Sequence, residues 1–323
     1  MDRPKREPQL FAMLAYQTRY HLAYRDSRLR TKTEQAVARL TSCTLCPRRC
    51  QVDRTAGETG YCRTGARAKV ASYHAHFGEE APLVGQNGSG TIFFSNCNLL
   101  CNFCQNFDIS HGGEGYELSD AELAQIMLSL QAAGCHNINF VTPSHVMPQI
   151  LSALLLAVEK GLEIPLVYNS GGYDSVETLR ILDGVIDIYM PDFKFWDSDV
   201  ARQTCQAPDY PVVARKAVVE MHRQVGELTM DARGIAVSGL LVRHLVLPCD
   251  LAGTGEVMAF IAGKISKNTY VNVMNQYRPC GRAPEIESMA RSVTSEEYAR
   301  AVAAARKAGL TRLDRPRRVF MLY

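Results

Sequence analysis

The chain has 323 residues, of which 46% are hydrophobic and 21% are charged. These values are typical of globular domains, so they exclude a disordered, collagen-like or low-complexity chain. The longest strongly apolar run, residues 151–158, is far shorter than the roughly 20 residues that a membrane-spanning helix needs. A net charge of +3 is too small to indicate a nucleic-acid or membrane partner over the whole surface.

The positive charge is concentrated at the two ends of the chain. Residues 1–40 contain nine Lys or Arg against four Asp or Glu, and residues 311–323 contain four Arg against one Asp. We interpret both ends as solvated charged faces rather than phosphate-binding arms. The first 40 residues contain acidic side chains and no apolar signal core, which favours a cytoplasmic location.

The first predicted elements are helices. Apolar residues at helical spacing predict one or two helices in an N-terminal helical region, residues 1–40. Residues 41–88 are rich in Cys, Gly and Arg, which predicts a loop-rich module followed by a connector. Residues 89–323 are then expected to form the main domain.

The main domain alternates between short β-rich runs and helical runs. Strands are predicted at residues 91–95, 138–141, 165–168, 185–190, 240–247 and 270–274. Helices are predicted at residues 120–133, 148–160, 175–182, 214–225 and 255–265, the first of them capped by Ser119. Six alternating units predict an α/β fold with parallel strands, which is a barrel, an incomplete barrel or a doubly wound sheet.

In each of these architectures the ligand site lies at the carboxyl ends of the strands. Four predicted strands are followed there by unusual segments, at residues 97–104, 142–145, 169–172 and 192–194. Convergence of four such loops on one rim is typical of an active site, so the pattern favours an enzyme.

The chain has 11 cysteines, and seven of them fall in two groups. Without a secretory signal, clustered cysteines indicate metal binding or catalysis rather than disulfides. The isolated cysteines are interpreted as small buried apolar residues: Cys135, Cys205, Cys249 and Cys280.

One group consists of Cys97, Cys101 and Cys104, with no further cysteine in the next 30 residues. Three thiolates can take three corners of an iron–sulfur cluster, whereas electron-carrying ferredoxins supply four cysteines. One iron is then left with an open coordination position, which distinguishes a metal site that performs chemistry from a structural one.

This motif, with Phe103 before its last cysteine, resembles the signature of the radical S-adenosylmethionine (SAM) superfamily. In that superfamily the amine and carboxylate of SAM chelate the open iron of a 4Fe–4S cluster. One electron splits the sulfonium and releases a 5′-deoxyadenosyl radical, which abstracts hydrogen from the substrate. The resemblance therefore implies a catalytic role for the three cysteines.

Further segments resemble the branch of pyruvate formate-lyase activating enzyme-like proteins, whose members are similar to glycyl-radical enzyme activators. They read GSGTIFFSNCNLLCNFCQNFDIS, NINFVTPSH, PLVYNSGGYDS, DIYMPDFKF, RHLVLP and NVMNQYRP, preceded by CTLCPRRC and GETGYC. The resemblance implies an incomplete (βα)6 TIM-like barrel with an N-terminal helical and Cys-rich metal-binding module.

The resemblance also implies residues that contact SAM. Asp192 and Lys194 match an Asp-x-Lys that activating enzymes place beside SAM, and such a pair can hold a carboxylate and ribose hydroxyls. An exposed ion pair is the alternative. Asn169 and Ser170, before Gly171, approach the ribose or form a plain turn.

One departure from the superfamily concerns a Gly-Gly-Glu stretch that normally follows the second strand. Here Gly-Gly-Glu stands at residues 112–114, one helix too early, and we interpret it as coincidental. Thr142 or Ser144, with backbone carbonyls, then replaces its contact to the methionyl amine.

The second group of cysteines is Cys43, Cys46, Cys50 and Cys62. Four closed ligands fit either a structural zinc ion or an auxiliary iron–sulfur cluster, and the spacing leaves both open. Weaker metal candidates are His74 and His76 with Glu79 and Glu80, and we interpret the two histidines as solvent-facing. We expect His145 and His244 to be hydrogen-bonded core residues.

The sequence thus predicts a radical SAM enzyme with a 4Fe–4S cluster, SAM and a second metal site. The expected partners are a reduced flavodoxin or ferredoxin and a glycyl-radical enzyme. One alternative is radical modification of a small molecule, peptide or RNA. Another is a non-catalytic iron–sulfur or zinc protein that binds nucleic acid through its basic ends.

Overall fold

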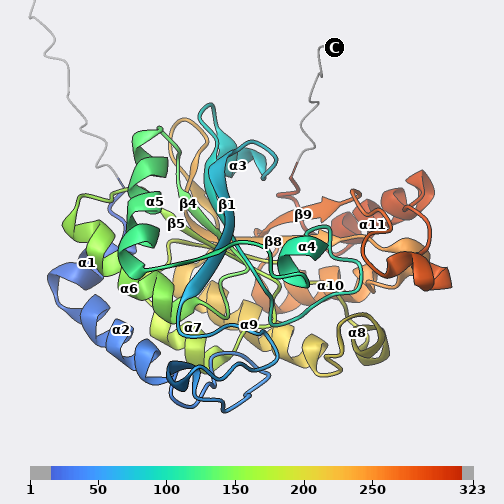
Figure 1. The fold of residues 1–323 in the computed structure, drawn as a ribbon. Helices are drawn as coiled ribbons and strands as arrows, with labels where there is room; N and C mark the ends of the chain where they lie inside the picture. The colour runs from blue at the N-terminus through green and yellow to red at the C-terminus, as the bar shows by residue number, and fades with distance from the viewer. Residues whose placement is uncertain (1–15, 315–323) are drawn as a thin grey trace, which may run out of the picture.

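The structure, a computed structural model, describes residues 16–314. Its centre is a nine-stranded sheet that Figure 1 shows with helices around it. Six strands are parallel neighbours: β2 (Ser89–Phe94), β4 (Ile138–Val141), β5 (Leu166–Ser170), β6 (Ile188–Pro191), β8 (Ala236–Leu245) and β9 (Tyr270–Met274). A closed barrel would need β9 to pair with β2. The free edge of β2 is instead occupied by β1, and β9 pairs only with β8, so the parallel sheet stays open as an incomplete barrel.

These six strands confirm the six strands predicted from the sequence. The largest shift is at β8, which begins at Ala236 rather than at residue 240, and the next is at β6, which begins at Ile188 rather than at residue 185. Asp187, just before it, uses its carboxylate to accept a hydrogen bond from the Leu166 N–H at 2.9 Å. The side chain of Asp187 therefore substitutes for a backbone partner at the start of β5.

The predicted helices between the strands are also present. They are α5 (Asp120–Ala132), α6 (Met147–Glu159), α7 (Val176–Leu182), α9 (Tyr210–Val225) and α10 (Thr254–Phe260). Ser119 and Glu122 form the capping box that starts α5, as the sequence predicts. The last predicted helix is shorter than expected, because α10 changes into a π-helical turn at Ile261–Ile265.

Several elements were not predicted. The connector in residues 41–88 contains β1 (Ala68–His76), which pairs antiparallel with β2 and with β3 (Tyr116–Leu118). Its sequence AKVASYHAH mixes Ala, Ser and His with only one β-branched residue, so it lacks the apolar β-rich run that marks the other strands. The remaining unpredicted elements are β7 (Thr229–Met230), α3 (Ala81–Val84), α4 (Phe107–Ser110), α8 (Ser198–Cys205) and α11 (Ser295–Lys307).

The N-terminal part of the described chain contains α1 (Arg19–Arg25) and α2 (Arg28–Ala38). Helix α2 packs against α6 and α7, at the lower left of Figure 1. Parts of the two basic segments, residues 1–15 and 315–323, lie outside the described residues. Among residues 16–314, no helix combines the length and apolarity that a membrane crossing requires.

Candidate active site

A cavity of about 410 Å³ lies at the carboxyl ends of the parallel strands. All six strands, or the loops that follow them, contribute to its lining. Nine of the ten residues predicted to hold the cluster or SAM line it: Cys97, Cys101, Phe103, Cys104, Thr142, Asn169, Ser170, Asp192 and Lys194. Residues from four separate loops therefore meet in one place, as the strand order predicts.

The loop after β2 presents the three cysteines to this cavity. Two of its residues, Asn96 and Leu100, have left-handed backbone with φ of 69° and 53°, which bends the chain tightly. The Leu99 N–H donates to Cys97 Sγ at 3.3 Å, and the Ser110 hydroxyl donates to Cys104 Sγ at 3.3 Å. Such donors stabilise a sulfur that carries negative charge.

The three thiols are neutral in the protein alone. Burial raises the pKa of Cys97 to about 12 and raises the pKa of Cys104 above its ordinary value. A hydrogen bond with Cys205, together with burial, raises the pKa of Cys101. Metal binding at these sulfurs must therefore displace protons, which makes the affinity depend on pH.

The isolated cysteines differ from the sequence interpretation. Cys135 and Cys205 are buried as predicted, but Cys249 is exposed and Cys280 is half-buried, so the prediction is wrong for the latter two. Cys205 is also not isolated, because it contacts Cys101 across more than 100 residues of sequence. Helix α8, which ends at Cys205, brings it there, since Thr204 O accepts the Asn102 N–H at 2.8 Å.

A chain of charged groups forms one wall of the cavity. Lys194 Nζ lies 2.7 Å from Asp192 Oδ2, and Arg243 Nε lies 2.8 Å from Asp192 Oδ1. Arg243 also contacts Glu79 Oε2 at 3.3 Å and donates to Asn169 Oδ1 at 2.8 Å. Arg243 and Glu79 line the cavity as well, although sequence reasoning assigned neither to the site.

The surroundings shift the pKa values of the two acids in this wall, Asp192 and Glu79, in opposite directions. Burial favours the neutral form of Asp192, but Arg243 and Lys194 overcome it and lower the pKa to about 2. Burial raises the pKa of Glu79 to about 7, against the opposing effect of Arg243. Asp192 therefore stays ionised at neutral pH, while Glu79 is poised to gain or lose a proton.

Ser144 does not reach the cavity, which corrects its predicted role. It is buried, and its hydroxyl donates to Asp174 Oδ1 at 2.6 Å. Ser170 donates to Asp174 Oδ2 at 2.6 Å, and Tyr168 donates to Asp174 Oδ1 at 3.1 Å. Asp174 thus collects three hydroxyl groups behind the cavity wall and fixes the Ser170 side chain.

Thr142 lines the cavity in an unusual conformation. Its φ is 62°, which is sterically unfavourable for a β-branched residue. Its N–H donates to Asn169 O at 2.9 Å, which ties the loop after β4 to the end of β5. Gly112 and Gly113, the early Gly-Gly-Glu match, line a different cavity beside Lys69, in agreement with a coincidental match.

Tyr210 and Gly172 brace the loops after β5 and β6. The Tyr210 hydroxyl lies 3.0 Å from Gly171 O and 2.9 Å from Asp192 O, and it accepts the Lys194 N–H at 2.8 Å. Gly172 has a φ of +76°, and a Cβ there would stand 2.3 Å from Asp192 O. Only glycine therefore allows the two loops to approach this closely.

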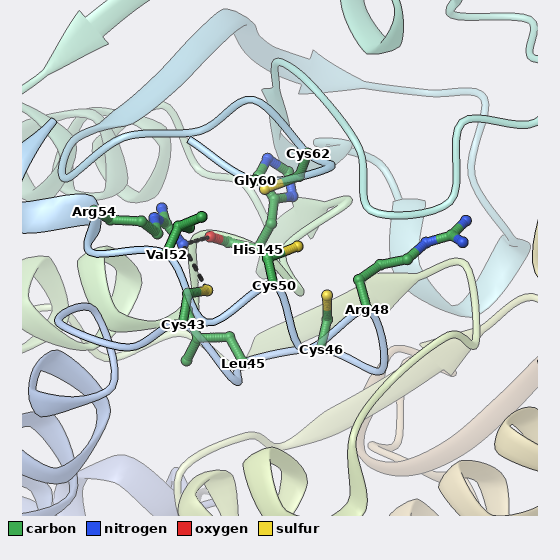
Figure 2. A pocket seen from close by; sticks show the side chains of 10 residues that line it. All are labelled: Cys43, Leu45, Cys46, Arg48, Cys50, Val52, Arg54, Gly60, Cys62 and His145. Carbon is green, nitrogen blue, oxygen red and sulfur yellow. Dashed lines mark hydrogen bonds between the residues drawn. The ribbon is translucent and has the colours of Figure 1, made fainter. Parts of the chain in front are cut away.

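The second group of cysteines surrounds a separate small cavity. Cys43, Cys46, Cys50 and Cys62 line it, and Figure 2 shows their side chains with His145. In the chain between residues 16 and 314, no three His, Cys, Asp or Glu side chains are arranged to hold a single metal ion. The structure nevertheless brings the four predicted cysteines together around one space.

The histidines are mostly accounted for by hydrogen bonds. His244 is buried, with Nδ1 2.7 Å from Phe193 O and Nε2 2.9 Å from Thr254 Oγ1, as predicted for a core residue. His145 Nε2 lies 2.9 Å from Ser95 O. His76 lines the cavity at the carboxyl ends of the strands, so its interpretation as a solvent-facing residue missed this location.

Comparison with known proteins identifies the family. The model of the radical SAM superfamily matches residues 91–230. The chain belongs to the radical SAM superfamily. An uncharacterized protein of Methanocaldococcus jannaschii, MJ0674, is 32% identical over 288 residues, which cover 86% of this chain and 78% of that protein. The radical SAM superfamily implies a 4Fe–4S cluster and SAM, so this chain is a radical SAM enzyme.

The chain is also similar, over part of its length, to solved structures. A radical SAM methyltransferase from Sphaerobacter thermophilus has 16% identity and a TM-score of 0.44, with 70% of this chain and 67% of that chain covered. HydG, a maturase of the FeFe hydrogenase, has 15% identity and a TM-score of 0.45 over 66% and 47%. Methylornithine synthase has 17% identity and a TM-score of 0.42 over 66% and 60%. The chain thus matches about half to two thirds of these structures' lengths.

Proposed function

We propose that this radical SAM enzyme activates a glycyl-radical enzyme, by abstracting hydrogen from a glycine Cα of that partner. The observation that carries the proposal is the convergence of Cys97, Cys101 and Cys104 with Asp192 and Lys194 on one cavity. This combination of residues is the one that resembles the glycyl-radical enzyme activators.

The residues of the cavity fit a 4Fe–4S cluster with SAM. Three thiols supply three ligands, and the cavity volume of about 410 Å³ is within the range of small-molecule sites. When bound there, the cluster supplies one electron to SAM, whose cleavage yields the hydrogen-abstracting radical. Cys97, Cys101 and Cys104 would hold the cluster.

The other residues of the cavity bind and orient. Lys194 offers a positive charge for the carboxylate of SAM, and Asp192 offers acceptors for the ribose hydroxyls. Asn169 is held in place by Arg243, and Phe103 places an apolar ring, 5% exposed, against the cavity. We assign the contact to the methionyl amine to Thr142, which lines the cavity, and to backbone carbonyls of its loop. Together they exclude water and fix the geometry of the reacting atoms.

Two partners follow from the proposal. A reduced flavodoxin or ferredoxin is the expected electron donor, and the reaction is expected in the cytoplasm. A glycyl-radical enzyme from the same genome is the expected substrate. Radical modification of a small molecule, peptide or RNA is the alternative, because the same cavity chemistry serves any of these substrates.

The proposal is tested in two stages under anaerobic conditions. First, the reconstituted protein is incubated with dithionite and SAM, and 5′-deoxyadenosine and methionine are measured. We expect both products from the native chain and neither from Cys97→Ala, Cys101→Ala or Cys104→Ala. Intact iron content without cleavage would contradict the assigned chemistry.

Second, the same mixture is supplied with each glycyl-radical enzyme encoded in the source genome. We expect a glycyl-radical signal in electron paramagnetic resonance, formed in step with 5′-deoxyadenosine. Cleavage of SAM that no such partner stimulates, but that a small molecule, peptide or RNA does, would replace the activator function with the alternative.

A further inference from the structure

The N-terminal group of cysteines has physical properties that the proposed function does not use. Its cavity has a volume of about 10 Å³, so the space among the sulfurs admits at least a water molecule. Cys43, Cys46 and Cys62 are buried, and Cys50 is half-buried. His145, from the loop after β4, completes one side of the cavity in Figure 2.

Arg54 places a buried positive charge beside these thiols. The residue is 1% exposed, and its guanidinium donates to Gly65 O at 2.6 and 2.9 Å and to His145 O at 2.8 Å. Its Nη1 also lies 4.0 Å from Cys43 Sγ. Within the described residues these partners include no carboxylate, and a buried charge without a counter-charge is strongly unfavourable. Thiolates that bind a metal supply that counter-charge.

His145 provides a second, independent indication of a ligand. The residue is 1% exposed, and its Nε2 lies 2.9 Å from the carbonyl oxygen of Ser95, so Nε2 carries the proton. Nδ1 therefore carries a lone pair, and it is buried without a partner in residues 16–314. A buried nitrogen without a partner beside four thiols indicates that this site binds a further group.

We propose that Cys43, Cys46, Cys50 and Cys62 bind a 4Fe–4S cluster beside His145. A zinc ion holds its sulfurs at about 2.3 Å, which leaves no water-sized space among them. Here the sulfurs border such a space, and in the described part of the chain no three ligands stand at single-ion spacing. A four-iron cluster separates its thiolates further and fits this wider arrangement.

The cluster site contacts the loop that carries the other cysteines. His145, which lines this cavity, donates to Ser95 O, and Arg48 Nε donates to Asn98 O at 3.0 Å, so residues around the cavity hold carbonyls on both sides of Cys97. The Asn98 side chain is also within hydrogen-bonding reach of the Cys46 thiol. The two metal centres are therefore neighbours, and their unpaired electrons are expected to interact when both are reduced.

Metal analysis tests the identity of the centre without any substrate. The anaerobically reconstituted chain is expected to hold about eight iron and eight sulfide per chain, and the triple variant Cys97→Ala, Cys101→Ala, Cys104→Ala about four of each. This triple variant leaves the N-terminal group intact. About four iron plus one zinc in the native chain, or no iron in the triple variant, would overturn the proposal. The iron and sulfide contents do not depend on SAM cleavage. A failure of this metal proposal can therefore be distinguished from a failure of the proposed function.

Spectroscopy tests the placement of the centre. The reduced native chain is expected to give a broadened paramagnetic resonance spectrum, different from the single-cluster spectrum of the triple variant. In the triple-variant background, Arg48→Met should shift the midpoint potential to more negative values, because Arg48 lines the cavity and its charge stabilises the reduced cluster. Arg49→Met is the matched control, since Arg49 is exposed and paired with Glu177. Equal midpoint potentials for the Arg48→Met and Arg49→Met variants would show that the cluster does not lie in this cavity.

Discussion

Asp192 and Lys194 are separated by one residue on extended chain at the end of β6, so their side chains leave the backbone on the same side. Phe193 between them is fully buried on the other side. The sequence alone therefore predicts the pair. It does not predict Arg243, which stands 51 positions further on and reaches Asp192 only because β6 and β8 are neighbours.

The first prediction concerns Lys194. Lys194→Met removes one charge from the cavity while Asp192 keeps its bond to Arg243. We expect SAM to bind about 10- to 100-fold more weakly, because a hydrogen bond to a charged group contributes about 1.5–3 kcal/mol. Equilibrium binding to the reconstituted protein measures this, with exposed Lys160→Met as the control. Unchanged affinity at full iron content would show that Lys194 does not contact SAM.

The second prediction concerns pH. Burial raises the pKa of Glu79 from 4.5 to about 7, so the folded state holds this proton more tightly than the unfolded state. The stabilisation is complete below pH 4.5 and is lost as the pH rises through 7. Glu79→Gln stays neutral, so its stability relative to the native chain should rise between pH 4.5 and 7, by on the order of 1–3 kcal/mol. Urea unfolding at several pH values measures it, and a pH-independent difference would contradict the assignment.

At the scale of elements, the alternation of strands and helices was predictable because each is buried against the others and shows it as an apolar run. Strand β1 escaped prediction because most of its side chains are only partly buried or exposed. Helix α11 escaped too, although Thr294 and Glu297 carry the capping-box pattern that would have indicated its start.

The third prediction concerns the contact between the loops after β5 and β6. Alanine in place of Gly172 would have to keep a left-handed φ, and its Cβ would clash with Asp192 O. The backbone strain and the clash both destabilise the folded state. Gly161→Ala also has a positive φ, but nothing lies within 4 Å of its Cβ. We expect Gly161→Ala to lower the free energy of unfolding by about 1–2 kcal/mol and Gly172→Ala by at least about 1 kcal/mol more. Equal losses in chemical denaturation would mean that the contact has no energetic weight.

At the scale of the whole molecule, the Cys-rich module is joined to the barrel by specific polar contacts. Arg54 donates to His145 O, Arg48 to Asn98 O and Thr178 to Leu45 O, all at 2.8 to 3.0 Å. Each contact joins the module to a loop or helix of the barrel. Metal binding in the module is therefore expected to stabilise more than the module itself.

The fourth prediction concerns metal removal. Ligands that bind only the folded state raise its stability, so the iron-free chain should melt at a lower temperature than the reconstituted chain. In the variant lacking Cys97, Cys101 and Cys104, reconstitution should still raise the melting temperature, but by less. Calorimetry of both proteins with and without iron measures the two increments. No rise at all in the variant would mean that Cys43, Cys46, Cys50 and Cys62 bind no metal.

The sequence by itself determined the features that depend on short separations: the Cys97 motif, the Asp192 and Lys194 pair, the strand and helix alternation, and the cavity's place at the strand ends. Only the tertiary structure decided which distant groups complete the site. Arg243, Glu79, Cys205 and Tyr210 arrive from other elements, and Ser144 turns away toward Asp174. The physical reason is that spacing along one strand or loop fixes local direction, whereas pairing between elements and competition among buried hydrogen-bond partners arise only when the chain is folded.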